Sequence, residues 1–525
     1  MNPARPFFEI FDSDPERLAI VQFDGVCVDR KSLAGRVYAF AEQLRQQGVQ
    51  PNDRVLLQIP PGIELTVCIL GVLWVGGVAL LLESGLGEDI YLARVRLSDP
   101  KWLVVHNKLI WVNRLPGVKG VLSHFEIDVP PVPQLETLTQ ITVSSKDLLK
   151  TAAPTPEASR KPDDEAVVVF TGGTTQAPKC VRFQCSALEH FLSHIYGVVG
   201  DAQMSSFLAD TPPQVLYGLK MGCTVYLNKG RKRKRAESMM SLVGSGAVDA
   251  CFTAPYLWME LIRLGQLEPL PQTLKTILLG SAPVTRDFLW QLLKFVHPNT
   301  RIICLYGMTE VGAISTVDAR DKAAWEGRGD LVGKVIEGVR VELEDRGMEE
   351  GVGEIVVYSS SLYAGYIGQE SRQANEGLKT GDLGCWEEVN GTLMLVLMGR
   401  IKDMIIRNGI NIYPQSFEAK IKERAVNSMN QPVLRDCAMV GVWNPERSDE
   451  DVVLFVQLIS KDNIQTENLM QIAEHVCGVD AKPDHCFVLD SLPVTGRQNK
   501  TDKQELRRKG ARLLGRDANV SHHDG

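Results

Sequence analysis

The chain has 525 residues, 44% of them hydrophobic, and this length exceeds what one hydrophobic core usually serves, so we expect at least two globular domains. A formal net charge of -7 gives no general attraction to nucleic acid or to anionic membranes. The 11 cysteines show neither a CxxC pair nor a metal-ligand spacing, and the first residues lack a secretory signal pattern. These features argue against a disulfide-rich secreted protein and favour a cytoplasmic protein with reduced thiols.

Alternating helices and strands are predicted for the first third of the chain. Four apolar residues share one helical face that ends at Gly48, namely Leu33, Val37, Phe40 and Leu44. The segment DRVLLQI at 53–59 then has the pattern of a strand, and the same alternation returns between residues 181 and 303. This order is typical of a parallel α/β architecture.

The apolar stretch at 65–82 is long enough to suggest a transmembrane helix. Gly76 and Gly77 interrupt it, however. A helix packed on a sheet, a glycine turn and a buried strand explain the stretch equally well, so we expect no transmembrane span.

After Gly399 the sequence changes to a compact segment, which ends in a predicted Lys/Arg-rich helix near 501–514. We therefore predict a large N-terminal domain at 1–399 and a small C-terminal domain at 400–516. The polar residues 517–525 are expected to form a disordered tail.

A loop rich in hydroxyl groups and glycine follows the apolar strand EAVVVF at 165–170. It reads FTGGTTQAPK at 170–179, and its candidate phosphate-binding residues are Thr171, Gly173, Thr174, Thr175 and Lys179. Glycine lets backbone N–H groups approach anionic oxygens, threonine hydroxyls donate further hydrogen bonds, and lysine adds a positive charge. From this loop alone, a plain Gly-Thr turn remains the alternative.

Further motifs follow in order: GSAPV at 280–284, LYGMTE at 305–310, TGDLG at 380–384, GRIKDMIIRNGINIYP at 399–414 and LPVTGRQNKTD at 492–502. Together with the loop at 170–179, they resemble the motifs of the adenylate-forming superfamily, which includes acyl-CoA synthetases, luciferases and peptide-synthetase adenylation domains. The resemblance covers essentially the whole chain and is closest in type to AMP-forming acyl-CoA synthetases. It implies a large domain of α/β subdomains and a small, mobile α+β C-terminal domain.

The resemblance also implies ATP, Mg²⁺ and a thiol acceptor, either CoA or the phosphopantetheine of an acyl carrier protein. Tyr306 would stack on adenine, while Asp382 and Arg400 would bind the ribose. Besides these three and the loop residues, the nucleotide-binding residues implied by the resemblance are Gly280, Ser281, Ala282 and Gly307.

Catalysis is assigned by the same resemblance to three residues. Thr309 would contact the α-phosphate of ATP, and Glu310 would hold Mg²⁺. Lys500 would bridge the carboxylate of the acid substrate and the α-phosphate. The alternative Lys503 is predicted to be a solvated charge on a helix.

The resemblance implies two half-reactions, formation of acyl-AMP from a carboxylic acid and ATP and then transfer of the acyl group to the thiol. Two residues of the motif at 399–414 concern the second. The resemblance places the hinge of the small domain at Lys402 and the pantetheine tunnel beside Gly409, so Gly409 favours a step that forms a thioester. A simple turn glycine is the other interpretation of Gly409.

Several departures from the family pattern keep alternatives open. Gln176 and Cys180 replace glycines, and a positive φ at either site would cost stability, so a weakly active or non-catalytic relative is one alternative. The segment 207–227 is shortened as in β-lactone synthetases, which act on β-hydroxy acids. The leading hypothesis remains a ligase for a fatty or otherwise apolar acid.

Two other groups of residues are interpreted as structural. The basic run at 229–235 is expected to be a solvated loop, with docking of CoA phosphates or of a carrier protein as the alternative. His190 and His194 have metal-compatible spacing, but they are expected to be structural or to line a pocket.

Overall fold

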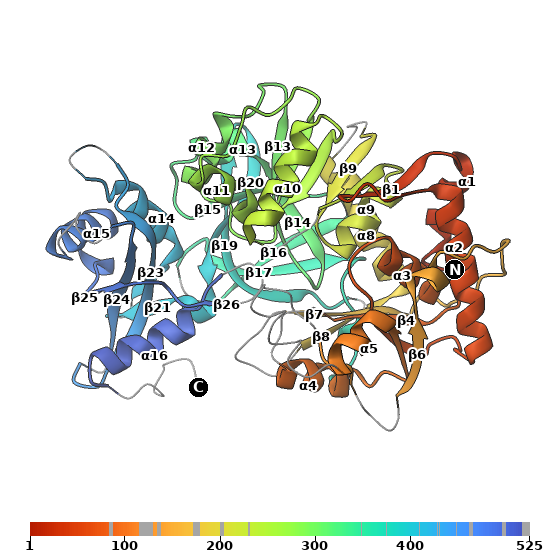
Figure 1. Cartoon of the computed structure of the whole chain (residues 1–525). Coiled ribbons are helices and arrows are strands. Elements are labelled where there is room, and N and C mark those ends of the chain that lie inside the picture. The colour runs from red at the N-terminus through yellow and green to blue at the C-terminus, as the bar shows by residue number, and fades with distance from the viewer. Residues whose placement is uncertain are drawn as a thin grey trace.

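The computed structural model describes residues 1–82, 88–114, 130–133, 138–171, 179–199, 204–228, 232–347, 349–373, 375–408, 410–427, 429, 431–447, 449–460, 466–495 and 500–516. Within them lie a 13-stranded sheet, a 7-stranded sheet and three small sheets. Figure 1 shows the C-terminal segment at one end of the molecule and the N-terminal helices at the other. This mixed arrangement confirms the predicted α/β fold class. The predicted tail at 517–525 lies outside the described residues.

The 7-stranded sheet has the order β18-β8-β7-β4-β3-β5-β6. Its strands are β3 (Arg54–Gln58), β4 (Val78–Leu81), β5 (Trp102–His106), β6 (Thr139–Val143), β7 (Glu165–Thr171), β8 (Lys179–Gln184) and β18 (Gly365–Tyr366). Strands β7, β4, β3, β5 and β6 run parallel, as predicted, whereas β8 and β18 are antiparallel to their neighbours. The associated helices are α2 (Arg30–Gln47), α3 (Ile63–Trp74), α4 (Glu88–Ser98), α5 (Asn107–Arg114) and α7 (Ser145–Leu148).

The apolar stretch at 65–82 folds as the predicted helix, turn and strand. Helix α3 ends at Trp74, Gly76 turns the chain with a φ of +80°, and β4 begins at Val78. In the described part of the chain, no helix combines the length and the apolar character that crossing a membrane requires.

The 13-stranded sheet has the order β16-β17-β19-β20-β15-β14-β13-β12-β11-β9-β10-β1-β2. Its strands are β1 (Leu18–Gln22), β2 (Cys27–Asp29), β9 (Ser206–Ala209), β10 (Thr224–Leu227), β11 (Ala250–Thr253), β12 (Thr276–Leu279), β13 (Arg301–Met308), β14 (Gly312–Asp318), β15 (Asp330–Val335), β16 (Val339–Asp345), β17 (Gly353–Ser359), β19 (Leu378–Val389) and β20 (Thr392–Arg400). The helices that accompany it are α1 (Arg5–Ser13), α8 (Cys185–Val199), α9 (Pro212–Lys220), α10 (Lys232–Gly244), α11 (Pro255–Arg263), α12 (Arg286–Leu293) and α13 (Ala319–Ala324).

The C-terminal segment builds its own small sheet. Its elements are η1 (Ile401–Asp403), β21 (Ile405–Arg407), β22 (Ile410–Ile412), α14 (Gln415–Arg424), β23 (Leu434–Asn444), β24 (Asp449–Leu458), α15 (Thr466–Ala481), β25 (His485–Leu489), β26 (Val494–Thr495), β27 (Lys500–Thr501) and α16 (Lys503–Leu513). Leu454 and Phe455, adjacent on β24, enter two different apolar cores, as alternation along a strand requires. Both cores contain only residues from Ile405 onward.

The basic run at 229–235 was predicted to be a solvated loop. From Lys232 onward it is a helix, on which Arg233 and Lys234 are exposed as predicted but Arg235 is not. Lys232 begins α10, and the side chain of Arg235 is 24% exposed. Its guanidinium lies 3.0 Å from the carboxylate of Asp210, just after β9. The buried Ala236 and Met239 fix the face that α10 turns inward, and this orientation brings Arg235 to Asp210. Residues 229–231 lie outside the described residues.

Candidate active site

The predicted adenine side lies at the carboxyl ends of β12 and β13. These strands are parallel and pair Leu279 with Cys304, so Gly280 follows β12 beside Leu305 and close to Tyr306. A Cβ atom at Gly280 would lie 3.3 Å from the Cβ atom of Leu305, so the two segments approach closely. Carboxyl ends of parallel strands are the usual place for a nucleotide in such sheets.

Two residues of this region have special backbone requirements. Ser281 has a φ of +69°, which is uncommon for a residue with a side chain. At Gly307 a Cβ atom would lie 2.1 Å from the carbonyl oxygen of Gly312, so only glycine fits. The close approach of two backbone segments therefore explains why residue 307 is a glycine. Thr309, two residues further along, is exposed.

Tyr306, Asp382 and Arg400, which the resemblance assigns to the adenine and the ribose, contact one another. The Tyr306 hydroxyl donates to Asp382 Oδ2 at 2.8 Å, and Arg400 Nε lies 2.9 Å from Asp382 Oδ1. Burial, reinforced by the negative charge of Asp382, raises the pKa of Tyr306 well above its ordinary value, so its hydroxyl stays a donor. The Asp382 side chain is 6% exposed, and its carboxylate already binds the Tyr306 hydroxyl and the Arg400 guanidinium, which an incoming ribose must share or displace.

Glu310, Tyr366 and Lys179 form a second cluster from three separate segments. The Tyr366 hydroxyl donates to Glu310 Oε1 at 2.8 Å, and Lys179 Nζ lies 5.0 Å from the centre of the Tyr366 ring. The short strand β18 pairs Tyr366 with Val181 of β8, close to Lys179. The backbone N–H of Tyr363 donates to the Glu310 carbonyl at 2.9 Å and ties the same segment to the LYGMTE motif.

Sequence reasoning missed Tyr366. The only local signal is Gly365, whose φ of +127° allows the bend before it, and no spacing relates either residue to Glu310. Burial and the nearby Glu310 charge raise the pKa of Tyr366, so it too remains a neutral donor.

The Glu310 carboxylate suits a hard cation. It is 6% exposed, and its Oε1 accepts the Tyr366 hydrogen bond, while Oε2 bonds to no other residue in the described part of the chain. Mg²⁺ typically takes one or two carboxylates together with substrate phosphates. Glu310 therefore fits the role of a magnesium ligand beside a bound nucleotide.

Several predicted residues lie outside the described residues: Gly173, Thr174, Thr175, Gln176 and Gly409. The side chain of Thr171 is likewise not described, although its backbone ends β7.

The concern about Cys180 is wrong. Cys180 lies on β8, where it pairs with Phe170 in extended conformation, and it is not among the residues with positive φ. A glycine is therefore not required at this position.

The family described as "AMP-binding enzyme" matches residues 7–367. The chain belongs to this family. That membership confirms the resemblance to the adenylate-forming superfamily. This AMP-binding enzyme is 24% identical over 440 residues to the putative acyl-CoA ligase YdaB of Bacillus subtilis, which covers 79% of this chain and 81% of that protein. It is also 22% identical to a polyketide synthase-nonribosomal peptide synthetase of Aspergillus clavatus. The match covers 95% of this chain but only 12% of that protein.

Solved structures share the fold of this AMP-binding enzyme. The o-succinylbenzoate CoA synthetase MenE of Bacillus subtilis, in complex with an acyl-adenylate intermediate, has a TM-score of 0.76 at 21% identity, covering 97% of this chain and 98% of that chain. The same protein in complex with ATP and a magnesium ion has a TM-score of 0.75. The fold of the AMP-binding enzyme is thus that of adenylate-forming structures along almost its entire length.

The two candidate lysines near the C-terminus have different surroundings in the AMP-binding enzyme. The backbone of Lys500 on β27 pairs with Thr495 on β26, and the Lys500 side chain is not described. The prediction that Lys503 is a solvated charge is wrong, because its side chain is 14% exposed and its Nζ lies 2.7 Å from Glu418 Oε1. The first turn of α16 points Lys503 toward α14, where Glu418 neutralises it.

His190 and His194 both have protein partners on or near α8. His190 Nδ1 lies 2.7 Å from the carbonyl oxygen of Ser186, and His194 Nε2 lies 3.5 Å from Ser359 Oγ. Burial, with a smaller effect from His190, lowers the pKa of His194 to about 4, so His194 is neutral at physiological pH.

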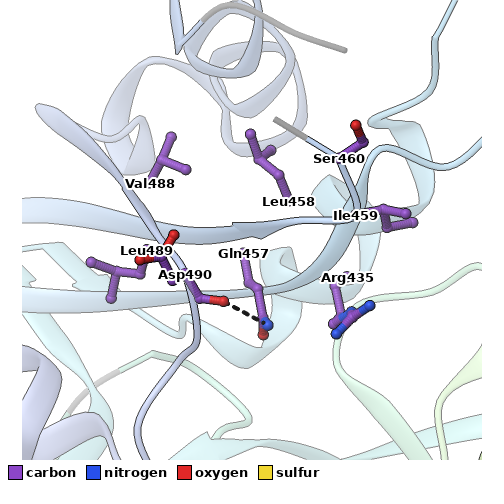
Figure 2. Close-up of a pocket in the computed structure, with 8 residues that line it drawn as sticks. All are labelled: Arg435, Gln457, Leu458, Ile459, Ser460, Val488, Leu489 and Asp490. Atoms are coloured by element: carbon purple, nitrogen blue, oxygen red, sulfur yellow. Dashed lines mark hydrogen bonds between the residues drawn. The ribbon is translucent and has the colours of Figure 1, made fainter. Parts of the chain in front are cut away.

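A cavity of about 230 Å³ lies at the edge of the small C-terminal sheet. Figure 2 shows its lining, which comprises Arg435, Gln457, Leu458, Ile459, Ser460, Val488, Leu489 and Asp490. None of the residues predicted for the nucleotide site is among them. The candidate active site is therefore defined by the two clusters around Asp382 and Glu310 and not by this cavity.

Proposed function

We propose that this AMP-binding enzyme is an AMP-forming acid–thiol ligase. It joins a carboxylic acid to ATP, forming acyl-AMP and pyrophosphate, and then transfers the acyl group to a thiol. The observation that carries the proposal is the presence of two clusters that share the LYGMTE motif, a ribose-type cluster, Tyr306–Asp382–Arg400, and a phosphate-type cluster, Lys179–Tyr366–Glu310. Family membership and the motif order support the same assignment.

The two half-reactions balance without a further co-reactant. A carboxylate oxygen attacks the α-phosphorus, and the bond from that phosphorus to the pyrophosphate oxygen breaks. The thiolate sulfur then attacks the acyl carbon, and AMP leaves with the former carboxylate oxygen. Both steps depend on positioning and on neutralising charge, which is the work of cations and hydrogen-bond donors.

Particular residues would supply these interactions. Lys179 and the loop residues Thr171, Gly173, Thr174 and Thr175 would bind the phosphates, and Thr309 would contact the α-phosphate. Glu310 would hold Mg²⁺, and the cation would neutralise phosphate charge, because Mg²⁺ is commonly bound by one or two carboxylates together with substrate phosphates. Tyr306 would cover the adenine, next to Gly280, Ser281, Ala282 and Gly307, while Asp382 and Arg400 would bind the ribose.

The chain divides into the domains 1–399 and 400–516 in this proposal. The two apolar cores of the C-terminal sheet draw only on residues from Ile405 onward, which supports the boundary. Lys402 is exposed in the short η1 turn and serves as the hinge. Rotation about it would bring Lys500 to the carboxylate for the first half-reaction and withdraw it for the second.

The thiol is CoA or the phosphopantetheine of an acyl carrier protein. The acyl-CoA ligase name of one relative supports CoA, and the synthetase of Aspergillus clavatus, of which this chain spans a small part, supports a carrier protein. Gly409 would leave room for the pantetheine arm. The free state of all 11 cysteines supports a reducing, cytoplasmic location.

The acid is apolar, fatty or aromatic, in this proposal. The ring of Phe191 lies about 3.0 Å from where a Cβ atom on Gly312 would be, immediately beyond the LYGMTE motif. Phe191 also stacks on Tyr217, with 5.8 Å between ring centres. Packed aromatic rings next to this motif favour an apolar substrate over a charged one.

The test is mass-spectrometric analysis of products with ATP, Mg²⁺ and decanoate, benzoate, 4-coumarate, 2-succinylbenzoate or 3-hydroxydecanoate, each with and without CoA. We expect AMP and an acyl-CoA together with at least one acid. AMP with 3-hydroxydecanoate alone and no CoA requirement would favour the β-lactone alternative. Absence of AMP with every acid would favour the non-catalytic alternative.

Tyr366→Phe is expected to raise the Mg²⁺ concentration for half-maximal AMP formation and to lower kcat/KM by about 10-fold to 100-fold. The reason is that a hydrogen bond to a charged group contributes about 1.5–3 kcal/mol, and Phe keeps the ring over which Lys179 lies. Initial rates over a Mg²⁺ titration measure both effects. Tyr358→Phe removes a hydroxyl from a ring that packs under Arg340 instead, and it is the control. An unchanged Mg²⁺ dependence in Tyr366→Phe would exclude a positioning role for this hydroxyl.

A further inference from the structure

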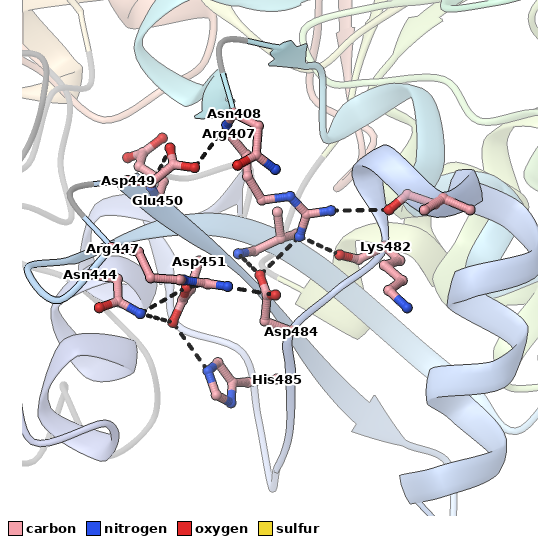
Figure 3. Close-up of polar contacts among 12 residues, drawn as sticks. Arg407, Asn408, Asn444, Arg447, Asp449, Glu450, Asp451, Lys482, Asp484 and His485 are labelled. Carbon is pink, nitrogen blue, oxygen red and sulfur yellow. Dashed lines mark hydrogen bonds and ion pairs between the residues drawn. The ribbon is translucent and has the colours of Figure 1, made fainter.

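Two carboxylates fasten the β21–β22 hairpin to the small C-terminal sheet (Figure 3). The backbone N–H of Ile406 donates to Glu450 Oε2 at 2.8 Å, and the backbone N–H of Asn408 donates to Asp449 Oδ2 at 2.8 Å. Both acceptors lie at the start of β24, so this end of β24 holds β21 and the residue that follows it. Hydrogen bonds from a backbone N–H to a carboxylate are stronger than those between neutral groups.

Arg407 adds a third attachment between the same parts. Its side chain is 7% exposed, and its Nη1 donates to Asp484 Oδ2 at 2.9 Å and to the Lys482 carbonyl at 2.8 Å. Asp484 Oδ2 also accepts the backbone N–H of Val452 at 2.8 Å, so it links the hairpin to β24 as well. Three successive residues, Ile406, Arg407 and Asn408, are therefore all bound to carboxylates at the start of β24 and just before β25 (Figure 3).

A glycine, Gly441, leaves space for the carboxylate of Glu450. Glu450 is 2% exposed, and a Cβ atom on Gly441 would lie 2.7 Å from its carboxyl group, so a larger residue there would displace the carboxylate. A buried charge is costly unless it is hydrogen-bonded, and the Ile406 N–H supplies such a bond. Gly441 and Glu450 thus form one unit with the hairpin.

The chain before the hairpin is anchored elsewhere. Arg400 pairs with Asp382 across β19 and β20 and forms an ion pair with it. Between this anchor and the first bound residue of the hairpin lie only the η1 turn, Ile401–Asp403, and two residues after it. A rotation between the two parts must be absorbed in this short stretch, because the residues on either side are held.

We propose that Asp449, Glu450 and Asp484 are positioning residues that fix the β21–β22 hairpin to the C-terminal sheet, so that hairpin and sheet turn as one body. The hairpin then presents one fixed surface to the thiol in the second half-reaction. Formation of acyl-AMP, which uses the other orientation of the sheet, does not depend on these carboxylates. The expected effect on thioester formation rests on the proposed acid–thiol ligase function. The attachment of the hairpin to the sheet does not.

The structural test is hydrogen–deuterium exchange of the full chain, followed by mass spectrometry of peptides that cover 404–413. Glu450→Ala is expected to speed exchange of the hairpin amides by about tenfold, since it removes one charge-assisted hydrogen bond. Glu450→Gln keeps an acceptor oxygen in the same place and should restore most of the protection. Glu446→Gln changes an exposed carboxylate on the neighbouring turn and should leave the exchange unchanged.

The kinetic test uses the acid that releases the most AMP among the five named above. With its synthetic acyl-AMP and CoA, Glu450→Ala is expected to form the thioester about tenfold more slowly, while ATP–pyrophosphate exchange with the free acid stays within about twofold. Equal loss of both half-reactions, with Glu450→Gln no better, would overturn the positioning role.

The two tests separate the two proposals. If the wild-type chain forms no thioester but hairpin exchange responds to Glu450→Ala, the ligase function fails and the attachment of the hairpin stands. If the wild-type chain forms a thioester but hairpin exchange is the same in Glu450→Ala and wild type, the attachment fails and the ligase function stands.

Discussion

Replacing Lys500 by alanine is expected to lower the rate of acyl-AMP formation by about 10²-fold to 10³-fold, the loss usual when one group that stabilises the charge of a transition state is removed. Thioester formation from synthetic acyl-AMP should stay within about twofold of wild type, because in the proposed mechanism Lys500 has left the site by then. ATP–pyrophosphate exchange measures the first step, and quenched single-turnover assays measure the second.

Two variants sharpen this prediction. Lys503→Ala serves as the matched control, because Lys503 is held by Glu418 and should affect stability more than either half-reaction. Gly409→Leu should show the opposite pattern to Lys500→Ala, with acyl-AMP formation retained and thioester formation lost. If Lys500→Ala slowed both steps alike, one active site serving two orientations of the small domain would be excluded.

Glu310→Gln is expected to reduce acyl-AMP formation by about 10²-fold or more, because a carboxylate that holds a divalent cation beside phosphates accounts for several kcal/mol of charge stabilisation. Glutamine has the same shape and retains an oxygen that can accept the Tyr366 hydroxyl, so the fold should persist. Isothermal titration calorimetry should show weaker binding of Mg²⁺-ATP, with smaller change for ATP in EDTA.

The control for Glu310→Gln is Glu337→Gln, which alters an exposed carboxylate on the loop before β16. Its kinetics and Mg²⁺-ATP affinity should match those of wild type. Equal affinities of Glu310→Gln and wild type for Mg²⁺-ATP would contradict the assignment of Glu310 as the magnesium ligand.

Local patterns were sufficient to predict much of the fold. The apolar face that ends at Gly48 is α2, and the interrupted stretch at 65–82 is α3 followed by β4, because glycine turns and period-3.6 faces are short-range features. The order of strands in the two large sheets was not predictable in this way. The pairing of β18 with β8, for example, joins residues about 180 positions apart, and tertiary packing decides it.

Candidate site residues could be named from the sequence where a motif contained them. Tyr306, Asp382 and Arg400 each belong to a recognisable motif, and the structure brings them into contact. Tyr366 was missed because its role comes from a strand pairing and not from spacing. The predictions for Lys503 and Cys180 were wrong because neighbouring residues do not reveal their surroundings. Lys503 has an ion-pair partner on α14, and Cys180 lies on an extended strand.

The central claim is that a carboxylate oxygen attacks the α-phosphorus of ATP, and oxygen-18 in the carboxylate of the acid tests it most directly. Wild-type enzyme, ATP, Mg²⁺, CoA and the labelled acid should yield AMP that carries one oxygen-18 atom per thioester formed, because thiol attack on the acyl carbon leaves that oxygen on phosphorus. Label in inorganic phosphate with ADP as the product, or a thioester formed with unlabelled AMP, would contradict activation through acyl-AMP.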